Sequence, residues 1–211
     1  MRHLLHAEGF NIRLRPVRME DAAFIVWLRN LDYVKGKVGD SPTDVAGQEA
    51  WLRGYFERGR DYYLLAETRG EIPVGTDGIY DVAMASAEAG RFIIRADVPA
   101  AVPTSFLASD LAYTQMGLTQ LRATVVASNR HVHSYIRRFG FRQVKIERAG
   151  RVIGGKAVDM VHFVQTVEDW LRVREQIRPL ARLASTQVAE WEKMQFGKSQ
   201  PYDETPYKLA A

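Results

Sequence analysis

Residues 117–141, GLTQLRATVVASNRHVHSYIRRFGF, contain the pattern that decides the fold. Within them, residues 121–127 are mostly apolar and β-branched, which predicts a buried strand. Asn129 then opens a helix that runs through Phe139 and ends at Gly140. Strands that flank the helices at the centre of the chain predict at least one parallel, right-handed crossover inside an otherwise antiparallel sheet.

Apolar periodicity outlines the elements on either side of this stretch. Alternating or continuous apolar runs predict strands, apolar residues three or four positions apart predict helices, and the small residues 85–90 predict a turn. The predicted strands cover residues 12–17, 62–67, 72–82, 91–95, 121–127, 141–151 and 158–166. The predicted helices cover residues 19–30, a segment from a Ser41 or Thr43 cap to residue 56, residues 104–116 and residues 129–139. This order favours an α/β (α+β) fold with a mixed, mostly antiparallel central sheet and helices on both faces.

A change of composition near Glu168 marks the end of this core domain. Apolar residues then recur three or four positions apart over roughly twenty residues, which predicts a long amphipathic helix. Pro179 falls inside this helix and should kink it or split it, because proline lacks the backbone donor. The expected organisation is a core domain over residues 1–166, a helix over residues 167–196 and a tail over residues 197–211. The helix is expected either to pack on its own sheet or to form a homodimer.

The composition limits the classes of function. With 211 residues, 46% of them hydrophobic, the chain can bury one core. It has no cysteine, which excludes disulfides, thiolate metal ligands and cysteine nucleophiles, and its five histidines show no metal-site spacing. Without an apolar run near the roughly 20 residues of a membrane span, and without a signal-peptide pattern, we expect a cytoplasmic protein. The net charge of +4, with unevenly placed arginines, suits a polyanionic small ligand, and the lack of a basic block argues against nucleic acid.

Residues 117–141 resemble the second half of the GNAT N-acetyltransferase core, in which a strand, an asparagine and a helix ending in Gly-Phe follow one another. Leu14-Arg15-Pro16, Leu28-Arg29-Asn30 and Trp51 before a tyrosine-rich strand resemble the entry region of GNATs that acetylate amino-sugar nucleotides. They are similar as well to ribosomal-protein N-terminal and polyamine acetyltransferases. The resemblance covers about residues 10–166. It implies a GNAT acyltransferase domain whose parallel fourth and fifth strands splay apart, with the C-terminal helix as an addition.

The resemblance also implies acetyl-CoA as the co-substrate. The splayed edge of the fourth strand would bind the pantetheine arm as an added strand, and the N–H groups of Ile93 and Ile94 would polarise the thioester carbonyl. The next helix would bind the pyrophosphate with its first N–H groups. The family's phosphate loop carries glycines, whereas residues 97–105 contain none and Pro103 removes one donor. The expected co-substrate-binding residues are Ile93, Ile94, Arg95, Ala100, Ala101, Val102, Thr104, Ser105, Asn129 and Arg138. Asn129 has a second interpretation, as the cap of its helix.

Acetylation of an amine needs a base that takes a proton from the ammonium and an acid that protonates the leaving thiolate. Glu88 is the first candidate base, with His133 and Asp81 behind it, and each of them also has a structural interpretation as a surface group. Tyr135 is the candidate acid, but the count from the end of its helix places the family's acid tyrosine at Ile136, which favours a structural or CoA-lining role for Tyr135. No metal ion is expected in this chemistry.

The expected acceptor site consists of Arg29, Asn30, Trp51 and Tyr80, which lie in the elements that wall the acceptor in this family. A guanidinium group suits a phosphate or a carboxylate, so we expect acetyl transfer to the primary amine of a small molecule, an amino-sugar nucleotide. Two alternatives stay open. One is acetylation of a protein N-terminus, and the other is a catalytically inactive GNAT module that binds or assembles, which the glycine-free loop, Ile136 and the extra helix favour.

Overall fold

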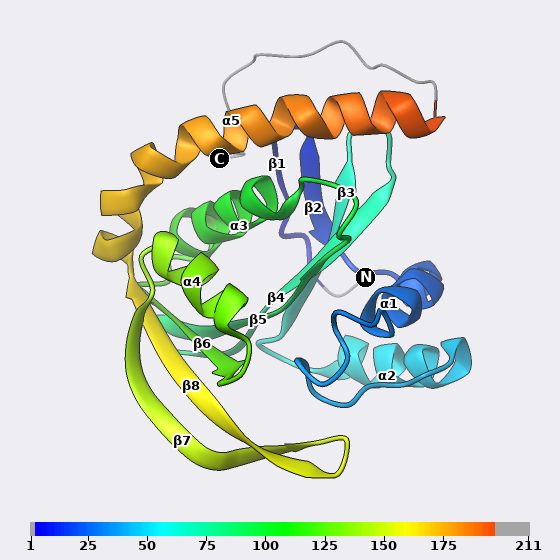
Figure 1. Ribbon diagram of the computed structural model, residues 1–211. Coiled ribbons are helices and arrows are strands. Elements are labelled where there is room, and N and C mark those ends of the chain that lie inside the picture. The colour runs from blue at the N-terminus through cyan, green and yellow to red at the C-terminus, as the bar shows by residue number, and fades with distance from the viewer. Residues whose placement is uncertain (1–2, 197–211) are drawn as a thin grey trace.

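An eight-stranded mixed sheet runs through the centre of the molecule, in the order β1-β2-β3-β4-β5-β6-β8-β7 (Figure 1). The computed structural model describes residues 3–196. β5 and β6 pair in parallel, and the other neighbouring strands pair antiparallel. The strands are β1 (Ala7–Gly9), β2 (Ile12–Pro16), β3 (Tyr62–Thr68), β4 (Pro73–Ala83), β5 (Ser86–Ile94), β6 (Gln120–Val126), β7 (Arg142–Ile153) and β8 (Lys156–Thr166). The single parallel pair inside an antiparallel sheet confirms the predicted crossover.

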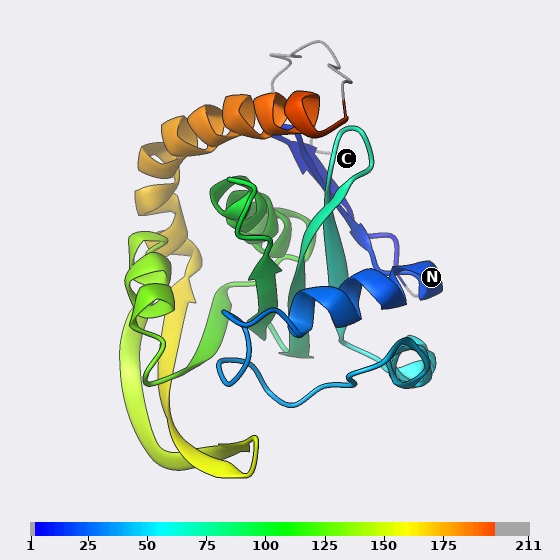
Figure 2. The ribbon, with the colours of Figure 1, turned by 45° about the vertical axis from the view of Figure 1, so that its right-hand side comes forward.

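Helices cover both faces of this sheet, as the sequence predicts (Figures 1 and 2). α1 and α2 lie on one face, α3 and α4 lie on the other, and α5 runs along one side of the molecule. Their bounds are α1 (Ala22–Arg29), α2 (Val45–Glu57), α3 (Ala101–Asp110), α4 (Arg130–Arg138) and α5 (Val167–Phe196). A short 3₁₀ turn, Met19–Asp21, precedes α1, and a π-helical turn, Leu111–Gln115, extends α3.

The side chains of β3 alternate between two hydrophobic clusters, one on each face of the sheet. Leu64 and Ala66 are fully buried in the main cluster, which includes residues of α3 and α5. Tyr63 and Leu65 are buried in a second cluster, which includes residues of α1 and α2. Because successive residues of a strand point to opposite faces, β3 anchors both helical layers and fixes the sheet between them.

Three predicted boundaries were wrong, each for a local reason. Residues 86–90 of the predicted turn belong to strand β5, because the chain already reverses around Met84, which has a φ of +51°. α2 is capped by Asp44, which accepts a 2.7 Å hydrogen bond from Gly47 N, and not by Ser41 or Thr43. α3 begins at Ala101 instead of residue 104, because proline is tolerated in the first helical turn.

α5 is one continuous helix that changes direction along its length, and Pro179 does not split it (Figures 1 and 2). The indole Nε1 of Trp170 donates to Asp110 Oδ1 at 2.9 Å, and Arg174 forms two 2.7 Å hydrogen bonds with the same carboxylate. α5 therefore packs on α3 of its own chain. The predicted tail, residues 197–211, lies outside the described residues. Among residues 3–196, no helix combines the length and apolar composition that a membrane span requires.

Candidate active site

β5 and β6 separate after three paired positions. Their parallel pairing ends at Glu88 opposite Arg122, after which β6 pairs only with β8. A cavity of about 190 Å³ opens at this divergence, and we call it the donor cavity. Its walls include Ala89 to Phe92 of β5, Ala123 to Val125 of β6, and side chains of α3 and α4. The predicted gap between the two parallel strands is therefore present and open.

A β-bulge in β5 lies at the edge of the donor cavity. The β4 and β5 register pairs Gly78 with Gly90 and Thr76 with Ile93, so that Arg91 and Phe92 both oppose Asp77. Arg91 has a φ of +54°, and its carbonyl oxygen accepts a 2.8 Å hydrogen bond from Thr76 Oγ1. A bulge leaves backbone groups outside the sheet ladder. These groups are available to a ligand in the donor cavity.

The side chain of Arg91 holds this bulge in place. Its guanidinium forms two hydrogen bonds with the buried carboxylate of Asp61, at 2.5 and 3.0 Å. The same group lies over the rings of Tyr80, Tyr63 and Trp51, at 4.4, 5.2 and 5.5 Å from their centroids. Three cation–π contacts and a two-point ion pair restrict the side chain, and through it the backbone of the bulge.

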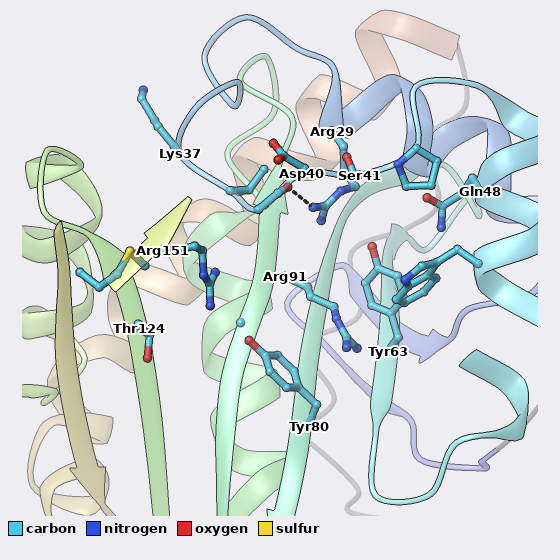
Figure 3. A pocket seen from close by; sticks show the side chains of 16 residues that line it. Arg29, Lys37, Asp40, Ser41, Gln48, Tyr63, Tyr80, Arg91, Thr124 and Arg151 are labelled. Atoms are coloured by element: carbon cyan, nitrogen blue, oxygen red, sulfur yellow. Dashed lines mark hydrogen bonds between the residues drawn. The ribbon is translucent and has the colours of Figure 1, made fainter. Parts of the chain in front are cut away.

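A second cavity of about 280 Å³ lies next to the bulge, and we call it the acceptor cavity (Figure 3). Arg29 of α1, Trp51 of α2 and Tyr80 of β4 line it, as expected, together with Arg151 of β7. Burial raises the pKa of the Tyr80 hydroxyl, which keeps that group protonated. The donor and acceptor cavities share the lining residues Lys37, Val38, Gly90, Arg91 and Thr124. A donor and an acceptor molecule could therefore meet at the bulge.

Asn30 is not part of this site. Its side-chain amide donates to the Val26 carbonyl oxygen at 2.9 Å, and the residue ends α1 outside the acceptor cavity. Its expected role in acceptor binding is therefore replaced by a local role in the helix end.

The first turn of α3 contributes the N–H groups of Ala101 and Val102, which have no partner within the helix by position. Ser105 lines the donor cavity, whereas Ala100 and Thr104 are fully buried below this turn and do not line it. An anion at this helix start would meet two backbone donors and the helix dipole, without the glycines of the family's loop. Ala101 and Val102 do not line the donor cavity either, so a pyrophosphate site at this helix start stays a prediction.

Ile93, Ile94 and Arg95 lie beyond the donor cavity, because the bulge places residues 89–92 at its edge. Ile93 is buried in a cluster with Leu28, and the Ile94 carbonyl oxygen accepts a 2.7 Å hydrogen bond from the Tyr33 hydroxyl. Arg95 N donates to Val74 O at 2.9 Å, and its guanidinium pairs with Asp97. The edge of β5 that faces the donor cavity therefore lies at residues 89–92 instead of the expected residues 93–95.

None of the three candidate bases lines the donor cavity or the acceptor cavity. Glu88 is half-buried and lies 3.7 Å from the guanidinium of Arg122. The Nε2 atom of His133 lies 3.1 Å from the Val126 carbonyl oxygen, and burial lowers the pKa of the ring. The side chain of Asp81 lies at the edge of a third, shallow hollow near Arg58. The structure therefore leaves Glu88 near the divergence of the strands and places His133 against the sheet.

α4 supplies two of the expected residues to the donor cavity, Asn129 and Tyr135. Asn129 occupies the cap position of α4, but its side chain makes no capping hydrogen bond and lines the cavity instead. The Tyr135 hydroxyl donates to Ala101 O at 2.9 Å and shares a 2.9 Å hydrogen bond with Ser105 Oγ. Arg138 is exposed on the outer face of α4 and does not line the donor cavity.

Sequence reasoning missed Asp77, the one carboxylate that lines the donor cavity. Burial raises the pKa of this carboxyl group to about 7. The sequence signal for Asp77 was its inward-facing position in the segment from Gly75 to Ile79. The glycines in this segment made it hard to recognise as a core strand. Arg151 was also missed, because only the curvature of the β7 and β8 hairpin brings it over the acceptor cavity. No cluster of metal-ligating side chains occurs among residues 3–196.

Comparison with known proteins agrees with this geometry. The acetyltransferase (GNAT) domain model matches residues 11–142. A GCN5-related N-acetyltransferase from Brucella melitensis superposes with a TM-score of 0.73 at 18% identity, covering 86% of each chain. Apo FdhC, a nucleotide-linked sugar GNAT, gives a TM-score of 0.69 at 23% identity over 85% of this chain and 98% of its own. Mycobacterium smegmatis RimJ in complex with CoA-disulfide gives a TM-score of 0.69 at 23% identity over 81% and 90%. No curated protein matches the sequence.

A sheet that opens between two parallel strands, with a bulge where two cavities meet, defines an acyltransferase of the acetyltransferase type. The chain belongs to the GNAT acetyltransferase family, whose domain covers more than half of it. Members of this family use acetyl-CoA as the acetyl donor.

Proposed function

We propose that this enzyme transfers the acetyl group of acetyl-CoA to the primary amine of a small anionic acceptor, an amino-sugar nucleotide. The observation that carries the proposal is the positive charge around the acceptor cavity, which adjoins the bulge where the thioester would react. A polyamine would be repelled by such a lining, whereas phosphate groups would be attracted.

Three cations of the acceptor cavity have no carboxylate partner within residues 3–196: Arg29, Lys37 and Arg151. Arg29 donates to the Gly39 carbonyl oxygen at 3.1 Å, which orients its guanidinium toward the hollow (Figure 3). Asp40 is the one acid in the lining, and its Oδ1 accepts a 3.1 Å hydrogen bond from Gly154 N. These guanidinium groups without a carboxylate partner support binding of a phosphate or carboxylate.

On the donor side, the proposed acetyl-CoA contacts are the backbone of residues 89–92, the first N–H groups of α3, and Ser105 and Asn129. The bulge N–H groups would stabilise negative charge on the thioester oxygen. Glu88 remains the proposed base, acting through water, because it lies just before the bulge on the strand that borders both cavities.

A thiol-release assay over amino-sugar nucleotides, neutral amino sugars, polyamines and N-terminal peptides tests this function. We expect turnover with the amino-sugar nucleotides and a higher KM for the neutral amino sugars. Preferred turnover of N-terminal peptides would favour the protein N-terminal alternative. Absence of turnover, together with absence of heat in an acetyl-CoA titration, would favour an inactive binding module.

A further inference from the structure

Asp77 places a buried carboxyl group inside the donor cavity. The residue lies in the middle of β4, and only 6% of it is exposed. Its Oδ1 accepts a 2.7 Å hydrogen bond from Gly78 N, and no arginine or lysine pairs with it among residues 3–196. A buried carboxyl group without a cation is expected to be neutral, because a lone charge is costly to bury.

The position of Asp77 relates it to the reacting part of the cavity. Asp77 lies on β4 directly opposite the bulge of β5. Its neighbours Thr76 and Gly78 pair with Ile93 and Gly90. The backbone groups released by the bulge and the carboxyl of Asp77 therefore belong to the same segment of the cavity wall.

Few charged groups surround this carboxyl. β3 presents Leu64 opposite Asp77, and the remaining cavity walls near it are mostly apolar. Across the whole donor cavity, the charged and titratable side chains other than Asp77 are Lys37, Arg91 and Tyr135, and the other polar ones are Ser105, Ser109, Thr124 and Asn129. With burial raising its pKa to about 7, Asp77 would exist both as acid and as carboxylate near neutral pH.

The cavity otherwise lacks a suitable acid. The position expected for an acid tyrosine holds Ile136, which has no proton to give. The neighbouring Tyr135 already donates to Ala101 O, and burial raises the pKa of its hydroxyl. Its proton is therefore engaged with the first turn of α3.

We propose that Asp77 is the acid that protonates the departing thiolate. This inference rests on the proposed acetyl transfer. In that step the amine gives up a proton through water to Glu88, its nitrogen forms a bond to the acetyl carbon, the carbon–sulfur bond breaks, and sulfur retains the electron pair. The carboxyl group of Asp77 gives its proton to that sulfur, which leaves as a thiol, and the carboxylate regains a proton from solvent before the next turnover.

The test compares wild type with D77N, which cannot give a proton, and D77E, which can. D32N is the matched control, because Asp32 is exposed in a loop outside both cavities. kcat is measured against pH at saturating acetyl-CoA with an amine that the wild type acetylates. We expect the wild-type kcat to fall as pH rises through about 7. D77N should have a kcat about 100-fold lower than that of wild type, without this decline at alkaline pH. D77E should keep the decline.

Two further measurements do not depend on turnover. The ¹³C carboxyl resonance that disappears in D77N should titrate near neutral pH and shift when CoA is added, and CoA should bind D77N about as well as wild type in calorimetry. An unchanged pH profile and kcat in D77N, or a resonance that titrates in the ordinary range of aspartate, would overturn the assignment while leaving the acetyltransferase function standing. Absence of acetyl transfer to any amine would instead overturn the proposed function. If D77N does not fold, the titration of the wild-type carboxyl resonance and the dependence of the D77E kcat on pH test the assignment of Asp77.

Discussion

At the scale of single residues, Asp77 links stability to pH. Its pKa is raised to about 7 in the folded protein from an ordinary value of 3.8, so the folded state holds this proton more tightly. The stabilisation from the neutral group is fully present below pH 3.8 and is lost as pH rises through about 7. We expect D77N to gain roughly 2–4 kcal/mol relative to wild type between pH 4 and pH 8. Urea unfolding of both proteins at pH 4 and pH 8 measures this difference in the free energy of unfolding. The same dependence of that free energy on pH in the two proteins would contradict the prediction.

Arg151 provides a residue-scale test of acceptor charge. Removing an unpaired guanidinium that binds an anion should cost about 1.5–3 kcal/mol of acceptor affinity. R151Q is therefore expected to raise the KM for an anionic acceptor about tenfold or more, with little change in the KM for acetyl-CoA. R148Q is the control, because Arg148 lies on the same strand and pairs with Asp159 outside both cavities. Equal effects of the two variants would argue against an anion subsite.

The residue scale also shows what the sequence could not predict. Arg29, Trp51 and Tyr80, which the sequence groups in one acceptor site, line one cavity, because they lie on elements whose order periodicity predicts. Ile93, Ile94 and Arg95 were expected at the cavity edge, but a bulge shifts the strand and no local pattern announces it. The partners of Asp77 depend on register between strands, which a single sequence does not specify.

At the scale of elements, the bulge of β5 requires glycine at residue 90. A Cβ atom there would lie 2.6 Å from the Tyr80 hydroxyl oxygen, so an alanine must displace a ring that Arg91 holds. We expect G90A to lower kcat/KM by at least tenfold and to cost about 1–3 kcal/mol of stability. G54A is the control, since Gly54 lies at an exposed position of α2 with nothing within 4 Å of its Cβ position. That change should stabilise the protein by up to about 1 kcal/mol. A fully active G90A variant would contradict a restrained bulge.

α5 is the second element whose role can be tested. Trp170 is almost fully buried and hydrogen-bonded to Asp110, so W170A should destabilise the protein by about 3–5 kcal/mol. L171A is the neighbouring control, because that leucine is 59% exposed and should change stability by less than about 0.5 kcal/mol. Unfolding in guanidinium chloride measures the free energy of unfolding of W170A, L171A and wild type. A W170A variant as stable as wild type would show that α5 is a detachable appendage.

At the scale of the whole molecule, the order of elements was the most predictable property. Apart from the short strand β1, which the prediction missed, periodicity placed the strands and helices of the core in the right sequence, because each run buries one continuous face. Boundaries were less predictable, since the small residues of β5 lack the side chains that mark a strand. The long helix was expected from its apolar spacing, and its packing on α3 includes an ion pair between distant residues, Arg174 and Asp110.

The central claim is that the opening between β5 and β6 receives acetyl-CoA, and calorimetry with CoA tests it most directly. Ala89 lines that opening, so A89F should fill it, whereas A23F adds the same side chain on the exposed side of α1. We predict micromolar binding to wild type and A23F, and at least a tenfold loss for A89F. Equal affinity of all three proteins for CoA, or no binding to wild type, would contradict the account.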